Sequence, residues 1–376
     1  MAGSDPKNLV LLAAGGTGGH LFPAEALATV LDKRGIAVAL ATDHRAAHFK
    51  FPARTVHVIP SATVRGRDPI SLTRTGIVLT LGTAKAWTIV GRTKPQVVVG
   101  FGGYPTVPPL LAASFRRVPT ILHEQNSVMG RANSFLAPRV SAIATGFQTL
   151  RNLNRHWQSK VTFTGNPLRP QVVTAAQIPY AASGDGKLRV LVFGGSQGAR
   201  VMSEIVPMAI GLLDAGLVRE LSITQQARPE DLDTVRASYA RAGVAAEVAP
   251  FFADLPARMA AAHLIVSRSG ASTVAELSAI GRPAILVPLP HALDADQFEN
   301  AGVLEAAGGA IRIEQPEFTP ERLVAEITAL SNGRERLARM AQAAKSATRS
   351  TMTTSPRADR RFVPIVRQIQ SQCVAY

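Results

Sequence analysis

The sequence predicts an α/β protein of two Rossmann-like domains, each a doubly wound parallel sheet, facing each other across a cleft. Short apolar segments alternate with helical segments along the chain, which is typical of parallel strands covered by helices. Two glycine-rich loops, 15–19 and 194–198, each follow an apolar segment. Gly15 and Gly194 lie 179 positions apart, and two further glycine pairs share this offset. The repeat of strand, glycine loop and helix indicates two similar domains.

In the first half, the apolar spacing predicts one helix at 23–33, ending at Gly35, and a series of short strands. The strands are expected at Leu9–Ala13, 37–41, 55–59, 95–100 and 120–122. A change to Pro, Ala, Ser and Gly between 165 and 187 is typical of a connection. We therefore expect a first domain at 1–165.

The second alternation predicts a domain at 166–349, with a last helix at about 320–347. Its strands are expected at 189–193, 221–224, 246–248, 263–266 and 284–287, with helices ending at Leu213, Ala242 and Ile280. The basic tail 350–376 contains an apolar helical pattern at 362–369, and we expect it to pack back on the first domain.

The charge is unevenly placed in this 376-residue chain, which carries +15 overall. Residues 1–165 hold 19 lysines and arginines against six aspartates and glutamates. Such a field attracts anionic lipid, nucleic acid or a phosphorylated substrate, although it also serves solubility. Aromatic residues are only 5% and no basic–aromatic platform is visible, so we do not expect nucleic-acid binding.

Targeting and redox features point to a reducing compartment. The single cysteine, Cys373, excludes an internal disulfide and a cysteine metal cluster. No secretory signal is visible, and no apolar run reaches the roughly 18–20 residues that a membrane span needs.

Polar clusters follow the expected strands at 17–20, 102–104, 123–126, 195–197 and 268–273. Ligands of open parallel sheets bind beyond the carboxyl ends of the strands, so these clusters predict the functional site. The first loop lacks the dinucleotide fingerprint, and the acid closest to the end of the next strand is Asp43, which disfavours NAD. Its glycines favour a phosphate group instead.

Two residues of the first half are candidate bases. His20 stands at a helix start, where the dipole disfavours a charged ring, and could accept a proton, bind phosphate or only cap the helix. Glu124 is the one carboxylate of the first half that lies within a motif.

In the second half, Thr273 and Glu276 match a capping box, but they could equally bind a diphosphate and sugar hydroxyls. The acidic pair Asp231/Asp233 is expected on a solvated helix face. The pair Asp294/Asp296 is expected in a loop near the cleft. With no Cys/His ligand set, we expect no metal and no cofactor.

Seven motifs in order make the sequence resemble the bacterial MurG family of β-N-acetylglucosaminyltransferases, over about residues 8–310. They are GGTGGHxxP at 15–23, GxGGY at 100–104, HEQN at 123–126, GNPxR at 165–169, GGSQGA at 194–199, RSGAxTVxE at 268–276 and QxxNA at 297–301. Ser272 stands where the family usually has an apolar residue, and an insertion at 292–296 makes the alignment of Gln297 less secure.

The resemblance implies a B-type glycosyltransferase fold, with a lipid-linked acceptor on the first domain and UDP-N-acetylglucosamine on the second. It implies acceptor contacts from Thr17, His20 and Tyr104, with His20 as base and Glu124 as the next candidate. The donor contacts that it implies come from Thr17, Gly18, Gly19, Asn126, Arg169, Ser196, Phe252, Arg268, Ala271, Ser272, Thr273, Glu276 and Gln297. Within this set, Phe252 would lie beside the uracil and Glu276 would bind the ribose.

The implied reaction moves N-acetylglucosamine, with inversion, to the C4 hydroxyl of undecaprenyl-diphospho-N-acetylmuramoyl-pentapeptide in peptidoglycan synthesis. Because that acceptor stays in the bilayer, we expect a peripheral protein on the inner face of the plasma membrane. Basic residues between Arg65 and Lys94 flank apolar ones between Ile77 and Val90, which suits anionic headgroups, although the apolar residues also fit a core helix. The alternatives are a UDP-N-acetylglucosamine epimerase, a glycolipid or natural-product glycosyltransferase, and a non-catalytic binder.

Overall fold

The computed structural model describes residues 9–16, 18–45, 51–62, 68–181, 186–195, 198–290 and 294–349. Contacts within the described chain divide it after Arg169 into two compact units, here called unit 1 and unit 2. The predicted packing of the tail 350–376, and Cys373 with it, lie outside the described residues.

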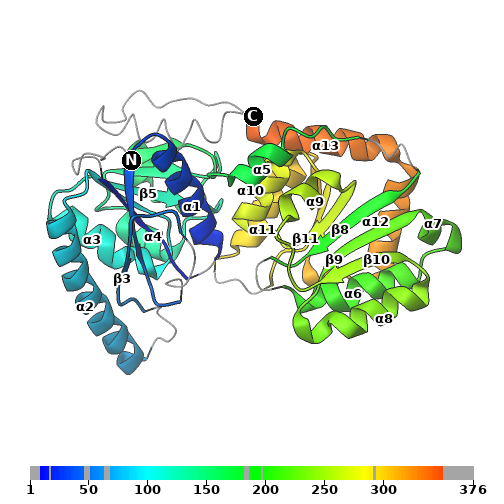
Figure 1. Ribbon diagram of the computed structural model, residues 1–376, viewed down its shortest axis with the longest axis horizontal. Coiled ribbons are helices and arrows are strands. Elements are labelled where there is room, and N and C mark those ends of the chain that lie inside the picture. Colours follow the sequence, from blue (N-terminus) through cyan, green and yellow to red (C-terminus); the bar gives the residue numbers. More distant parts are fainter. Residues whose placement is uncertain are drawn as a thin grey trace. The chain divides into compact units, whose positions relative to one another are not determined.

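Unit 1 is a seven-stranded parallel sheet in the order β3-β2-β1-β4-β5-β6-β7 (Figure 1). Its strands are β1 (Leu9–Ala13), β2 (Ala37–Thr42), β3 (Thr55–Val58), β4 (Val97–Gly100), β5 (Thr120–Glu124), β6 (Ala142–Thr145) and β7 (Val161–Phe163). Its helices are α1 (Gly18–Lys33), α2 (Pro69–Thr93), α3 (Val107–Phe115) and α4 (Arg131–Leu136).

Alternate strand residues build a core on each face of this sheet. Val10 and Leu12 of β1 pack with α1 on one face. Leu11 and Ala13 pack with α2, α3 and α4 on the other. Because successive side chains of a strand point to opposite faces, a strand buried on both sides must be apolar throughout, as β1 is.

Unit 2 is a six-stranded parallel sheet in the order β10-β9-β8-β11-β12-β13 (Figure 1). Its strands are β8 (Leu188–Phe193), β9 (Leu221–Gln226), β10 (Ala245–Ala249), β11 (Leu264–Ser267), β12 (Ala284–Leu286) and β13 (Ala310–Arg312). Its helices are α5 (Pro170–Ala175), α6 (Arg200–Gly211), α7 (Ala215–Glu220), α8 (Leu232–Ala242), α9 (Leu255–Ala261), α10 (Ala271–Ile280), α11 (Asp296–Ala306), α12 (Pro320–Asn332) and α13 (Arg334–Arg349).

Both sheets follow the Rossmann order, 3-2-1-4-5-6 when each unit's strands are numbered separately, with a seventh strand in unit 1. In unit 2, α6, α8 and α12 share one core with the sheet. Helix α10 packs with α5, α9 and α13. The predicted fold class is confirmed in both units.

Three predicted boundaries differ from the structure. Strand β5 continues through His123 and Glu124, which the sequence placed in a loop. Helix α1 begins at Gly18 and contains Pro23, so the glycine loop is shorter than expected. The single helix predicted at 320–347 is two helices, α12 and α13, separated at Gly333, whose φ of −110° and ψ of 58° are not helical. Across the described ranges, no helix has the length and apolarity to span a bilayer.

A buried arginine fastens the first segment of unit 2 to its core. Arg282 is 1% exposed. Its guanidinium donates to the carbonyls of Ile178 and Pro179, at 3.1 and 3.3 Å, and to those of Ala260, Ile280 and Gly281. Burial lowers the pKa of Arg282 to about 10, so the cation persists at neutral pH. Five carbonyl groups therefore depend on one side chain.

We expect Arg282→Lys to lower the free energy of unfolding by about 2–4 kcal/mol, since an ammonium cannot replace the planar fork and leaves buried carbonyls unsatisfied. Urea unfolding followed by circular dichroism measures the loss. Arg236→Lys is the matched control, because that side chain is 54% exposed and reaches one carbonyl, that of Val248; its effect should stay within about 0.5 kcal/mol. A loss below about 1 kcal/mol for Arg282→Lys would contradict this role.

Candidate active site

The polar loops of unit 1 meet because their strands are paired in parallel. Ala13 of β1 lies opposite Gly100 of β4, and Gly100 lies opposite Leu122 of β5. The segments that follow these residues therefore leave the same edge of the sheet at the same level. The glycine loop after β1, Gly102–Gly103 after β4 and 123–126 at the end of β5 are brought together as predicted.

Glycines in the first loop are required by close packing. A Cβ on Gly15 would lie 3.0 Å from the Pro105 ring, and Gly16 has a φ of +85°. Thr17 lies outside the described residues. Gly18 and Gly19 form the first turn of α1, so their N–H groups belong to a helix N-terminus, which favours an anion.

Asp43 follows β2 directly, where a dinucleotide-binding domain carries its ribose-binding acid. Its side chain is buried, and its Oδ2 lies 2.6 Å from the guanidinium of Arg45. The structure therefore places an acid at the end of this strand, and its carboxylate is engaged by Arg45.

His20 is the third residue of α1, and its ring lies over two glycines of another loop. Cβ atoms placed on Gly102 and Gly103 would lie 3.4 and 3.2 Å from the ring. Its Nδ1 lies 3.2 Å from Oε1 of Gln125, which is 105 positions further along the chain. Sequence reasoning noted the motif that contains Gln125 but gave that residue no role.

Glu124 is buried at the end of β5, and both of its carboxylate oxygens accept hydrogen bonds within unit 1. Its Oε1 accepts from the backbone and side-chain nitrogens of Asn126, at 3.0 and 3.3 Å. Its Oε2 accepts from the Gly130 N–H at 3.0 Å and from Nδ2 of Asn133 at 2.6 Å. Burial raises the pKa of Glu124, and these donors oppose that rise. The carboxylate therefore holds the loop and the Asn126 side chain in place.

Tyr104 and Arg169 each pack against a different part of unit 1. Tyr104 follows Gly103, whose φ is +72°, and its half-buried ring packs on the core that includes α3. Arg169 lies over the ring of Phe22 in α1, with 4.4 Å between the guanidinium carbon and the ring centre. Arg169 also lowers the pKa of Glu25, although burial has the larger effect and raises it.

In unit 2, the second glycine loop follows β8 and leads into α6. A Cβ on Gly194 would lie 2.1 Å from the backbone nitrogen of Ala199, so only glycine fits there. Gly195 and Gly198 have φ angles of +88° and +71°. Ser196, with Gln197, lies outside the described residues.

Helix α10 begins with an N-terminus that no side chain caps. Gly270 is its N-cap residue and Ala271 its first residue, so Thr273 is the third residue of the helix and Glu276 the sixth. The capping-box interpretation is therefore wrong, because its Ser or Thr would have to stand at position 270. Ser272 and Thr273 are half-buried in the first turn and Glu276 is buried.

Gln297 lies beside this N-terminus because α11 is tied to the loop that precedes α10. The Ser269 hydroxyl donates to the Gln297 carbonyl at 2.8 Å, and Nδ2 of Asn300 donates to the Ser269 carbonyl at 3.3 Å. Oε1 of Gln297 accepts from the Leu289 N–H at 3.1 Å. The structure thus fastens the start of α11, with Gln297, to Ser269 in the loop that precedes α10.

Two predicted donor-site residues have neighbours that the sequence did not indicate. Arg268 is buried, and its guanidinium donates to the carbonyls of Val287 and Pro288 and to Oε1 of Gln315. It therefore braces the segment after β12. Phe252 is buried beneath Arg258, with 4.2 Å between the guanidinium carbon and the ring centre, whereas Phe251 is 69% exposed.

The acidic pairs do not gather with other metal ligands. Asp231 accepts from Arg228, and Asp233 is exposed. Asp296 accepts from the Gln297 N–H. Within the part of the chain that the structure describes, no three His, Cys, Asp or Glu side chains lie close enough to hold a metal ion.

Comparison with known proteins gives matches to both units. The glycosyltransferase family 28 N-terminal domain matches residues 10–145, and the glycosyltransferase family 28 C-terminal domain matches residues 189–354. A protein of Rhodopseudomonas palustris is 62% identical over 340 residues, covering 90% of this chain and 93% of its own. A protein of Nitrobacter winogradskyi is 59% identical over 341 residues, covering 90% and 93%.

Both relatives are named UDP-N-acetylglucosamine–N-acetylmuramyl-(pentapeptide) pyrophosphoryl-undecaprenol N-acetylglucosamine transferase. Among solved structures, MurG of Acinetobacter baumannii is similar, with a TM-score of 0.73 and 29% identity, covering 96% of this chain and 99% of its own. The predicted resemblance is confirmed.

The buried His123 ring is expected to make the free energy of unfolding depend on pH. Burial lowers its pKa to about 4 from an ordinary value of 6.5. Between these two pH values the unfolded chain binds a proton that the folded chain does not, so stability falls as the pH falls through this window. The contribution is about 3 kcal/mol at about 1.4 kcal/mol per pH unit.

We expect His123→Gln to remove that part of the pH dependence between pH 6.5 and 4. Denaturant unfolding at a series of pH values measures the slope. His156→Gln, at an exposed position, is the control and should keep the wild-type slope. Equal slopes for all three proteins would show that His123 is not held neutral.

Proposed function

This chain belongs to glycosyltransferase family 28, and from that premise we infer that it is a MurG-type enzyme of peptidoglycan synthesis. It transfers N-acetylglucosamine from UDP-N-acetylglucosamine to N-acetylmuramyl-(pentapeptide) pyrophosphoryl-undecaprenol, the reaction in the names of relatives about 60% identical over nine-tenths of the chain. The predicted function and enzyme class are therefore confirmed. We propose roles for the individual residues from the geometry of each unit.

We propose that unit 1 binds the acceptor and supplies the base. The anionic diphosphate of the acceptor would lie against the N-terminus of α1 at Gly18 and Gly19, where helix N–H groups and the dipole favour negative charge. His20 stands in that first turn, and Tyr104 follows the glycine pair under its ring. His20 would take the proton of the C4 hydroxyl as that oxygen attacks the anomeric carbon with inversion.

The geometry favours His20 over Glu124 as this base. Both oxygens of Glu124 already accept hydrogen bonds from Asn126, Gly130 and Asn133. A base needs a lone pair that can reach the substrate proton. Glu124 would instead act by holding Asn126, which we propose binds a hydroxyl of the transferred sugar. We propose that Arg169, which lies over Phe22, also contacts the donor.

We propose that unit 2 binds the UDP moiety at the N-terminus of α10. Negative charge grows on the leaving diphosphate in the transition state, and helix N–H groups fixed in advance stabilise it. Ala271, Ser272 and Thr273 form this turn. Glu276 lies one turn further and would accept from the ribose hydroxyls, and Gln297, fastened beside the loop, would bind the sugar.

The remaining donor contacts come from the outer loops of unit 2. The glycine loop with Ser196 would face the phosphates. Phe252 would offer backbone groups to the uracil while its ring stays under Arg258. Arg268, already bound to three oxygens, would act by holding the loop after β12.

We further propose that unit 1 binds the anionic surface of the inner membrane leaflet, where the acceptor resides. Helix α2 buries Ala86 and Val90 but exposes Ile77, Leu81 and Trp87, by 56, 60 and 41%. The residues of α2 that the sequence assigned to the membrane are thus divided between the core and the surface. Arg65 and Arg67 lie outside the described residues.

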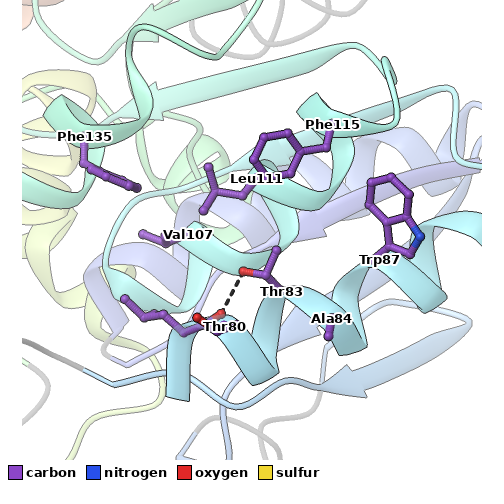
Figure 2. A pocket seen from close by; sticks show the side chains of 9 residues that line it. Thr80, Thr83, Ala84, Trp87, Val107, Leu111, Phe115 and Phe135 are labelled. Carbon is purple, nitrogen blue, oxygen red and sulfur yellow. Dashed lines mark hydrogen bonds between the residues drawn. The ribbon is translucent and has the colours of Figure 1, made fainter. Parts of the chain in front are cut away.

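Neighbouring elements extend this apolar surface and surround it with cations. A cavity of about 470 Å³ opens between α2 and α3. Figure 2 shows Trp87, Phe115 and Phe135 around it. The guanidinium carbon of Arg116 lies 4.1 Å from the Trp87 ring centre, and that of Arg139 lies 5.1 Å from the Phe135 ring centre. Apolar side chains flanked by arginines suit the boundary between acyl chains and anionic headgroups.

We predict that UDP release from UDP-N-acetylglucosamine requires the lipid-linked acceptor. The assay follows UDP with and without acceptor for the wild type, His20→Ala and the control His156→Ala. His20→Ala should lower the turnover rate by roughly 10²- to 10⁴-fold without weakening donor binding, and the control should match the wild type. Turnover without acceptor would favour an epimerase, and no turnover with acceptor would favour a binding protein.

Membrane binding should require both charge and apolar contact. Sedimentation with phosphatidylglycerol vesicles should capture the wild type, less so at high salt, and phosphatidylcholine vesicles should capture little. Leu81→Asp should lower binding at least several-fold, whereas Ile178→Asp, at a 47% exposed apolar residue of unit 2, should not. Binding that ignores salt, lipid charge and Leu81→Asp would refute the proposed surface.

A further inference from the structure

A chain of hydrogen bonds runs from His20 into the interior of unit 1. Nδ1 of His20 lies 3.2 Å from Oε1 of Gln125, and Nε2 of Gln125 lies 2.9 Å from Nδ1 of His123. Nε2 of His123 lies 3.0 Å from the carbonyl oxygen of Gly165. His123 and Gln125 are buried, at 0 and 1% exposure. The chain therefore links a half-exposed imidazole to a backbone carbonyl through two buried side chains.

The carbonyl at the inner end decides where every proton in this chain lies. A carbonyl oxygen only accepts, so Nε2 of His123 carries a hydrogen. A neutral imidazole carries one hydrogen, so Nδ1 of His123 is an acceptor. Burial lowers the pKa of His123 to about 4, which keeps the ring neutral.

The amide of Gln125 must then turn its nitrogen toward His123. A second contact fixes the same orientation, because Nε2 of Gln125 also donates to the His123 carbonyl at 2.9 Å. The amide oxygen is left facing His20. Since that oxygen only accepts, Nδ1 of His20 carries the hydrogen and Nε2 of the neutral ring keeps its lone pair.

The anchor itself is held rigidly. Gly165 has a φ of +75°, and its N–H donates to the Thr145 carbonyl at 3.1 Å. The next residue, Asn166, donates from Nδ2 to the Gln125 carbonyl at 2.9 Å. The segment at 165–166, which the sequence placed at the start of a connection, therefore fixes both the acceptor of His123 and the backbone of Gln125.

We propose that Gln125 and His123 are positioning residues that hold His20 in the tautomer with hydrogen on Nδ1, so that Nε2 is the atom that takes the acceptor proton. The inference rests on the proposed function only for its consequence for the rate. The hydroxyl proton passes to Nε2 as the new C–O bond forms and the bond to UDP breaks with its electron pair. The resulting imidazolium still donates from Nδ1 to the Gln125 oxygen, so this contact serves both charge states of His20.

Several other ionisable groups lie on the elements around His20. Glu124 and His123 lie in β5, Tyr104 follows Gly103, and Glu25 lies along α1 beside Arg169. Glu124 interacts electrostatically with His20 and sits next to Gln125. Its carboxylate accepts from Asn126, Gly130 and Asn133, so it makes no choice between the two ring nitrogens of His20.

The test compares Gln125→Leu with Gln125→Glu. Leucine has a similar volume but cannot bind Nδ1 of His20. Glutamate keeps an oxygen that accepts from this atom, whether or not the acid is ionised. We expect Gln125→Leu to lower kcat by roughly 10²-fold with the donor KM within about threefold. Gln125→Glu should retain more activity than Gln125→Leu, although a buried acid destabilises the protein more than leucine does.

A purely structural role reverses that order, because the more stable leucine variant would then be the more active one. The tautomer is read directly from the ring ¹⁵N shifts of histidine-labelled protein, with His20 identified by the signals missing from His20→Gln. The wild type and Gln125→Glu should show hydrogen on Nδ1, and Gln125→Leu should show the Nε2–H form or a mixture. Hydrogen on Nδ1 in Gln125→Leu, or a kcat within threefold of wild type, would overturn the proposal.

The ¹⁵N readout needs no turnover, so it separates this inference from the proposed function. The tautomer of His20 could be fixed in the wild type and lost in Gln125→Leu although the protein transfers no sugar. That result would uphold the positioning role of Gln125 and refute the proposed reaction. Acceptor-dependent transfer with an Nε2–H form of His20 in the wild type would do the reverse. If Gln125→Leu fails to fold, Gln125→Met gives the same test, since methionine has a similar length and no amide oxygen that could accept from Nδ1 of His20.

Discussion

Parallel pairing of the strands is the constraint on which the candidate site depends. Ala13, Gly100 and Leu122 lie side by side in β1, β4 and β5, so the segments after them leave the sheet at one level. The same pairing in unit 2 places Phe193 beside Ser267, which brings the glycine loop and the start of α10 to one edge. Helix N-termini and strand ends of a parallel sheet share that edge, so the positive ends of the dipoles collect where the polar side chains are.

The end of β5 shows how polar groups can occupy a core without destabilising it. His123 and Glu124 end the strand, Gln125 follows it, and all three are nearly inaccessible to water. Each has partners that match its donors and acceptors, and these partners come from Gly130, Asn133, Gly165 and Asn166. A satisfied network of this kind has a defined geometry, since each group removed leaves another one buried and unpaired. Precise placement of His20 and Asn126 is what such a network supplies.

The two units differ in their charged and exposed apolar surfaces, and the proposed function assigns them different substrates. The basic first half carries the exposed apolar surface of α2, where Arg116 and Arg139 stack on Trp87 and Phe135. In unit 2 many arginines are paired with acids instead, as Arg258 is with Asp254 and Glu247. A lipid-anchored substrate and a water-soluble nucleotide sugar call for these two different surfaces.

The sequence by itself determined the fold class, the positions of most strands along the chain, and the glycine-rich and polar loops that follow them. Strands buried on both faces appear in the sequence as apolar runs. A tight turn that only glycine fits, as at Gly194, appears as a glycine-rich loop. Both signals are local and can be recognised without the tertiary structure. Strands β6, β7 and β13 escaped prediction because three or four residues carry too little pattern. The extension of β5 through His123 and Glu124 was hidden because it depends on pairing with Ala144 and Thr145 of β6, a strand that the sequence did not indicate.

Only the tertiary structure decided which contacts the residues of the motifs make. Thr273 and Glu276 have the spacing of a helix cap, and the start of α10 at Ala271 showed that they do not form one. The sequence offered His20 as the base and Glu124 as the next candidate, and the structure shows that Glu124 already accepts from four donors. The choice between the two nitrogens of His20 rests on Gly165, 145 positions away, because a hydrogen-bond chain transmits its direction through space and not along the sequence.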